Sequence, residues 1–124
     1  MKKIAIIGAT MLSIISSASY AQSFTTIDKP EQLKGLPSSL VMIEADWCST
    51  CLEQKKVISK IMQQDKYKSI KLYSVNFDKQ KNSLKNFNAS MQSTLIGYKD
   101  GKEVERVTGE TKLVPIQKIL DKTL

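Results

Sequence analysis

The stretch LVMIEADWCSTC, from Leu40 to Cys51, decides how the rest of this 124-residue chain is interpreted. Residues 40–45 are apolar on both faces except for Glu44, as in a strand that is covered on both sides. Residues 48–64 repeat apolar side chains at helical spacing. The stretch therefore predicts a buried strand, a short turn, and a helix that begins at the two cysteines.

Cys48 and Cys51 are the only cysteines of the chain, and their spacing places them one helical turn apart at the start of this helix. We expect Cys48 to face solvent. The free N–H groups and the macrodipole at a helix N-terminus stabilise a thiolate and so lower the pKa of a cysteine. Because the thiolate is the attacking species in thiol–disulfide exchange, the pair indicates redox chemistry.

The two cysteines could also form a purely structural disulfide or bind zinc. A structural disulfide across only two intervening residues closes a very small loop, which stabilises a fold weakly. A zinc site needs further ligands, and the chain contains no histidine, which also excludes Cys-His and Ser-His-Asp hydrolysis. No metal and no bound cofactor are therefore expected.

The first 21 residues predict a secretory signal peptide, because a basic start is followed by an apolar run over 4–15 and by small residues ending at Ala21. The apolar run is shorter than the roughly 20 residues that span a bilayer, and an uncleaved anchor is the alternative. We expect residues 22–124 to form one domain without a membrane span, located in a bacterial periplasm.

The chain carries 19 Lys and Arg against 12 Asp and Glu, a net charge of +7. These basic residues are dispersed and are not interleaved with aromatic side chains, so we expect a solvated basic surface and no nucleic-acid partner. We expect a monomer.

The remaining segments predict an alternation of strands and helices. The expected order is β-α-β-α-β-α-β-β-α, with parallel pairing at the front and helices on both faces of a mixed sheet. Asp28, Pro30 and Glu31 predict the start of the first helix, and Asp100-Gly101 predicts the turn of a closing hairpin. The strands are expected at 24–27, 40–45, 70–77, 94–98 and 103–108, and the helices from Asp28 to near Gly35 and at 48–64, 78–87 and 115–124.

The whole of residues 22–124 resembles the thioredoxin family, and especially the exported thioredoxin-like domain of transmembrane disulfide reductases. The resemblance rests on Ala45-Asp46-Trp47-Cys48-x-x-Cys51, with further matches at 75–78, 99–101 and Gly109. It implies a thioredoxin fold, a thiol:disulfide oxidoreductase, protein disulfide substrates and an upstream thiol that donates electrons. Cys48 would be the nucleophile, Cys51 would be buried and resolve the mixed disulfide, and Trp47 would cover the edge of the site. An aromatic side chain without a role is the alternative for Trp47.

The chain departs from the family first at residue 93. Thioredoxins place a cis proline, commonly followed by threonine, opposite the first sulfur, and Ser93-Thr94 aligns there. The Gln92–Ser93 bond is expected to be trans, because a cis bond before a non-proline residue costs about 2.5–4 kcal/mol. The Ser93 hydroxyl would stabilise the Cys48 thiolate by a hydrogen bond, or would be an ordinary loop serine. Loss of the proline also puts substrate docking in doubt and opens a chance of metal or cluster binding.

The second departure concerns the acid that thioredoxins bury six residues before the first cysteine, where this chain has Met42. Glu44 lies on the same pleat face. It would replace the missing acid and take the proton of Cys51, or it would reach solvent or a lysine.

We expect a reductant, by analogy with the exported reductase domains. The alternatives are a thiol oxidase or isomerase using the same pair, and a non-catalytic module that binds a protein or captures metal through the Ser93 loop.

Overall fold

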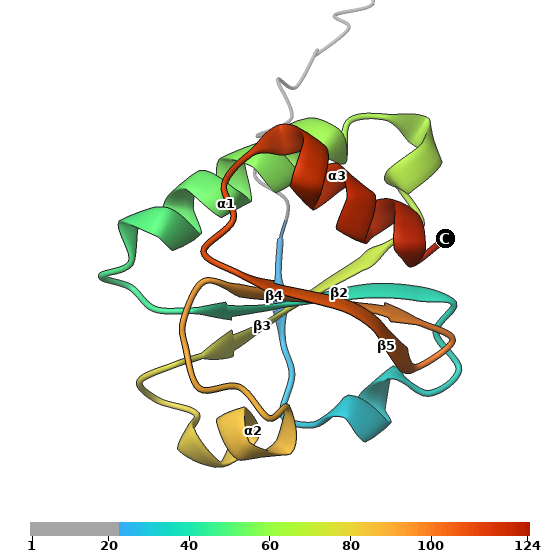
Figure 1. Cartoon of the computed structure of the whole chain (residues 1–124). Helices are drawn as coiled ribbons and strands as arrows, with labels where there is room; N and C mark the ends of the chain where they lie inside the picture. Colours follow the sequence, from blue (N-terminus) through green and yellow to red (C-terminus); the bar gives the residue numbers. More distant parts are fainter. Residues whose placement is uncertain (1–22) are drawn as a thin grey trace, which may run out of the picture.

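The computed structural model describes residues 23–124, so the predicted signal peptide lies outside the described residues. A five-stranded mixed sheet in the order β1-β3-β2-β4-β5 forms the middle layer (Figure 1). In the described part of the chain, no helix is long and apolar enough to cross a membrane. The strands are β1 (Thr25–Thr26), β2 (Ser38–Glu44), β3 (Lys71–Asn76), β4 (Thr94–Lys99) and β5 (Lys102–Thr108). The helices are α1 (Ser49–Ile61), α2 (Lys81–Asn86) and α3 (Leu113–Lys122), with the 3₁₀ helices η1 (Pro30–Leu33) and η2 (Asp65–Tyr67).

Strand pairing follows the predicted scheme. β3 pairs in parallel with β1 and β2, whereas β4 runs antiparallel to both β2 and β5. Asp100 and Gly101 have φ of 52° and 78°, and positive φ at both central residues is what a two-residue type I′ hairpin turn requires. The α/β architecture with a mixed sheet is therefore confirmed.

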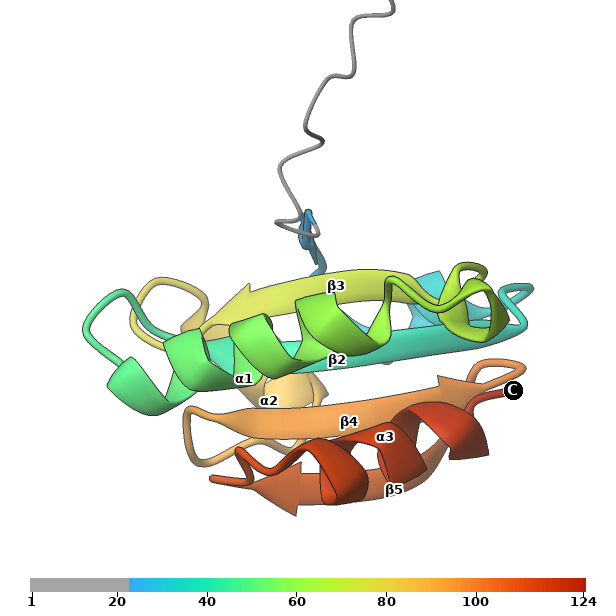
Figure 2. The ribbon, with the colours of Figure 1, turned by 90° about the horizontal axis from the view of Figure 1, so that it is seen from above.

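β2 is the central strand, and its side chains divide the core into two. Leu40 and Met42 join the core beneath α1 and α3, whereas Val41 and Ile43 join the core on the α2 face. Seen from above, α1 lies along β2 and β3 while α3 lies along β4 and β5 (Figure 2). The prediction of helices on both faces is confirmed, and the absence of a polar face on β2 is explained by this double cover.

The boundaries of every helix differ from the prediction, with α2 beginning at Lys81 and not at 78, and α3 at Leu113 and not at 115. The first helix is a single 3₁₀ turn whose N-cap is Lys29, one residue later than expected. The side chain that accepts the backbone N–H groups of Asp28 and Lys29 is consequently Gln32, at 2.9 and 3.0 Å, and not Glu31. α1 ends at Ile61, and the chain turns through η2 before β3.

Candidate active site

The site forms where the chain leaves the end of β2 and enters α1. Cys48 is the N-cap residue of α1, with an extended backbone, and its Sγ accepts the N–H of Cys51 at 3.1 Å. The two cysteines form a disulfide, with their Cα atoms 5.3 Å apart. The Cys48 sulfur therefore takes the place of a capping oxygen at the positive end of the helix dipole.

Both sulfurs are covered. Cys48 is only 4% exposed and Cys51 2%, so the expectation that Cys48 faces solvent is wrong. The reason is tertiary: Ser93, in the turn that precedes β4, brings its hydroxyl against both sulfurs. Three large apolar side chains close to Cys48, Cys51 or Ser93 in sequence are exposed, namely Trp47, Leu52 and Met91, at 62%, 56% and 51%.

Ser93 is itself buried, and its Oγ lies 3.0 Å from Cys48 Sγ and 3.4 Å from Cys51 Sγ. Its φ is 61°, in the left-handed region, and every peptide bond within residues 23–124 is trans, including Gln92–Ser93 as expected. A serine hydroxyl both donates and accepts, so it can donate to whichever sulfur carries negative charge. Ser93 was expected either to hydrogen-bond Cys48 or to be an ordinary loop serine, and in the structure its hydroxyl lies within hydrogen-bonding distance of the Cys48 sulfur.

Thr94 contacts the turn and not the sulfurs. Its Oγ1 donates to the carbonyl oxygen of Met91 at 2.8 Å and lies 3.0 Å from Oγ1 of Thr108 on the neighbouring strand. Thr94 therefore closes the turn that carries Ser93 and ties it to β5.

Trp47 lies at the rim. Its indole Nε1 donates a 2.7 Å hydrogen bond to Asp78 Oδ2, in the loop between β3 and α2. This bond joins the residue before Cys48 to a segment 31 residues away in sequence. The indole face is left open to solvent beside the disulfide.

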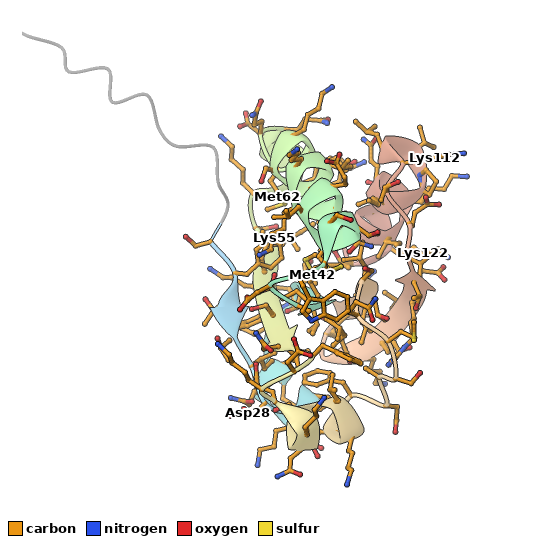
Figure 3. The ribbon with its side chains drawn as sticks, turned by 90° about the vertical axis from the view of Figure 1, so that its left-hand side faces the viewer. Asp28, Met42, Lys55, Met62, Lys112 and Lys122 are labelled. Atoms are coloured by element: carbon orange, nitrogen blue, oxygen red, sulfur yellow. A yellow bond between two sulfur atoms is a disulfide. The ribbon has the colours of Figure 1, made fainter. Side chains whose placement is uncertain are left out.

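Glu44 forms an ion pair with Lys55, and these side chains are 22% and 38% exposed. Lys55, labelled in Figure 3, lies one helical turn after Cys51 on α1. Its ammonium also lies 5.8 Å from the centre of the Phe24 ring. Met42 is completely buried on the same face of β2. Glu44 was expected either to take the proton of Cys51 or to reach solvent or a lysine, and in the structure its partner is Lys55.

Sequence reasoning missed one residue of the site, Gln54. It is completely buried on α1, and its Nε2 donates to the carbonyl oxygen of Ser93 at 2.9 Å. Helical spacing could have revealed it, because Gln54 lies three residues after Cys51 on the buried helix face that carries Ile58 and Ile61. A polar side chain on the buried face of a helix requires a partner.

Over residues 23–124, no group of three or more His, Cys, Asp or Glu side chains is placed to hold a metal ion.

A parallel sheet extended by an antiparallel hairpin, with a disulfide at the start of a helix beside the central strand, defines a redox protein of the thiol–disulfide class. The family model for thioredoxin matches residues 23–122. The chain therefore belongs to the thioredoxin family, and its Cys48–Cys51 pair makes it a thiol:disulfide oxidoreductase.

Individual relatives agree with this assignment. A thioredoxin of Chlamydia caviae is 33% identical over 76 residues, covering 60% of this chain and 72% of the relative. A thioredoxin of Chlamydia muridarum is 27% identical over 114 residues, covering 90% and 98%. The crystal structure of Trxlp from Edwardsiella tarda superposes with a TM-score of 0.68 at 36% identity, covering 73% of this chain and 87% of that one.

Proposed function

We propose that this protein is an exported oxidoreductase that reduces protein disulfides through a Cys48–Cys51 dithiol/disulfide cycle. The observation that carries the proposal is the environment of the Cys48 sulfur. It lies at the N-terminus of α1, accepts the N–H of Cys51, and touches the Ser93 hydroxyl. All three features stabilise a thiolate, which is the form that attacks a disulfide.

The proposed cycle has two exchange steps. The Cys48 thiolate attacks one sulfur of a substrate disulfide, forms a mixed disulfide, and expels the other substrate sulfur as a thiolate. Cys51 then attacks Cys48 Sγ, which closes the Cys48–Cys51 disulfide and expels the second substrate sulfur. Two electrons pass to the substrate, whose two sulfurs take up one proton released by Cys51 and one from solvent, which received a proton when Cys48 ionised.

An upstream thiol must reduce the pair again by the reverse exchange, because the chain supplies no other source of electrons. Partners have to reach sulfurs that are almost completely buried. Trp47 and Met91 are exposed on the two segments that bring Cys48 and Ser93 together, and their apolar surfaces suit contact with an extended substrate segment. In this proposal the domain works as a monomer.

Oxidation or isomerisation of protein thiols is the second candidate, and one observation favours it. Each contact that stabilises the Cys48 thiolate stabilises the reduced form, and a stabilised reduced form makes a couple more oxidising. Equilibration of the protein with glutathione buffers decides between the directions. A potential near about −270 mV supports the reductase, and one near about −120 mV supports the oxidase.

Exchange itself is tested with the two cysteine variants. Cys48→Ser is expected to abolish reduction of a model substrate such as insulin, because the attacking sulfur is gone. Cys51→Ser is expected to accumulate a covalent complex with substrate that a strong reductant releases. Full turnover by Cys48→Ser would rule out the proposed cycle.

Export is tested separately, by expressing the full chain in a Gram-negative host and analysing the periplasmic fraction. The proposal expects a protein that begins at Gln22, as measured by intact mass. A protein that retains residues 1–21 and stays with the membrane would support the uncleaved anchor instead.

A further inference from the structure

Gln54 is a completely buried amide in the middle of the active-site region. Its Nε2 donates two hydrogen bonds of 2.9 Å, one to the carbonyl oxygen of Ser93 and one to that of Glu110. A single side chain from α1 thereby holds both the turn before β4 and the loop between β5 and α3. Neither loop is near Gln54 in sequence, so these bonds are purely tertiary.

The stability of the fold does not explain why residue 54 is a glutamine. Its Oε1 is buried without a hydrogen-bond partner, and an unsatisfied buried polar atom destabilises the folded state. Leucine or methionine would fill a similar volume among the apolar side chains of α1 without that cost. The donor of Gln54 must therefore account for the presence of an amide at this position.

The bond to Ser93 acts on a backbone that needs support. With φ of 61°, Ser93 occupies a region that residues with a Cβ adopt only when the surroundings hold them there. The Ser93 N–H donates to Ile43 O at 2.8 Å, and its carbonyl oxygen accepts from Gly109 N at 2.8 Å as well as from Gln54. These three bonds fix the Cα from which the hydroxyl reaches both sulfurs.

We propose that Gln54 is a positioning residue for the redox pair. It holds the Ser93 backbone so that the hydroxyl stays against the Cys48 sulfur, and through that hydroxyl it sets the reduction potential of the pair. This inference rests on the proposed exchange function. It adds a residue that touches neither substrate nor the reacting sulfurs.

The test removes the donor and keeps the volume, with Gln54→Met. Without the bond from Nε2, Ser93 relaxes and its hydroxyl spends less time on the Cys48 thiolate. The reduced form then loses stability, so the equilibrium constant against glutathione should move about fivefold towards the oxidised protein. That change corresponds to a potential about 20 mV more negative. The pKa of the Cys48 thiol, followed by the pH dependence of alkylation, should rise in parallel.

A double-mutant cycle with Ser93→Ala tests the route of the effect. If Gln54 acts through the Ser93 hydroxyl, Gln54→Met should shift the potential in the wild-type background and have almost no effect in the Ser93→Ala background. Equal shifts in both backgrounds would overturn the inference, and so would no shift in either. Gln54→Leu provides a second donor-free variant if Gln54→Met does not fold.

Ile61→Val is the matched control. Ile61 is completely buried at the C-terminal end of the same helix, ten residues after Cys51, so its truncation should lower the urea midpoint and leave the potential unchanged. A potential that moves in Ile61→Val as it does in Gln54→Met would mean that general loosening of α1 is responsible, and the inference would fail.

The wild-type protein distinguishes failure of the exchange function from failure of the Gln54 inference. If it does not equilibrate with glutathione, the exchange function is wrong. If it equilibrates and Gln54→Met has the wild-type potential, only the role of Gln54 is wrong.

Discussion

Replacing Ser93 with alanine should make the Cys48–Cys51 pair a stronger reductant and a weaker acid. The variant removes one hydroxyl, which lies 3.0 Å from Cys48 Sγ and 3.4 Å from Cys51 Sγ. It keeps the Cβ, so the backbone at φ 61° experiences nearly the same strain. The difference between the two proteins is therefore close to the contribution of a single hydrogen bond.

The magnitude follows from the burial of the partners. A hydrogen bond to a charged group contributes about 1.5–3 kcal/mol, and with Cys48 only 4% exposed, water replaces the lost hydroxyl poorly. The N–H of Cys51, at 3.1 Å, still stabilises the thiolate, so we take the lower end of that range. About 1.5 kcal/mol corresponds to about 32 mV for this two-electron couple. The potential should become more negative by that amount at a pH where Cys48 is ionised, and the pKa of the Cys48 thiol should rise.

The assay can use the only tryptophan of the chain, because Trp47 adjoins the disulfide in sequence and we expect its emission to change on reduction. Titration with glutathione buffers gives the potential, and the rate of alkylation against pH gives the thiol pKa. Ser90→Ala is the control, since Ser90 is an exposed serine of the same loop. A folded Ser93→Ala protein with the wild-type potential and pKa would refute the stabilising role of the hydroxyl.

Three further outcomes are expected. Gly97→Ala should lower the urea midpoint by the equivalent of about 1–3 kcal/mol, because a Cβ on β4 would stand 3.1 Å from Ile119 Cγ2 where α3 packs; an unchanged midpoint would show that α3 yields easily. The Tyr67 hydroxyl donates a 2.7 Å hydrogen bond to Asp121, and this bond is the main cause of the lowered pKa of that carboxyl. The bond therefore stabilises the folded protein above pH 3.8, the pKa of the unfolded state, and this stabilisation is lost as the pH falls below that value. Tyr67→Phe should therefore be less stable than wild type in denaturant titrations at pH 7, and this difference should shrink below pH 3.8; a difference that does not change with pH would contradict the assignment. Trp47→Phe removes a bond between exposed groups, so stability should change by less than about 1 kcal/mol while kcat/KM for protein disulfides falls; an unchanged kcat/KM would leave the indole without a role in docking.

Local sequence patterns were sufficient to predict the elements and their order. β2 was recognised because a strand covered on both faces carries apolar side chains at nearly every position, and residues 38–43 are all buried. Asp100-Gly101 was recognised as the hairpin turn because few other pairs accept positive φ at both central positions. The weakest predictions were the short 3₁₀ turn after β1 and the end of α1, where a one-residue change in the cap alters the boundaries.

The candidate site was only partly predictable. Spacing alone places Cys48 and Cys51 at the start of a helix, because three residues make about one helical turn. The burial of Cys48 was predicted wrongly, since the group that covers it is Ser93, 45 residues further along the chain. The two bonds of Gln54 likewise span 39 and 56 residues, and no local pattern shows which carbonyl groups a buried amide will meet.

By itself, then, the sequence determined the order of strands and helices and the place of the redox pair, because these depend on periodicity and spacing within single elements. The thioredoxin family was indicated by the resemblance of Ala45-Asp46-Trp47-Cys48-x-x-Cys51 to its motif. The tertiary structure alone decided what surrounds the sulfurs. It brought the Ser93 hydroxyl onto both of them, locked that serine through Gln54, joined Trp47 to Asp78 and paired Glu44 with Lys55. These contacts depend on how segments that are separate in the sequence meet near the end of β2, and that meeting is set by the packing of the whole core.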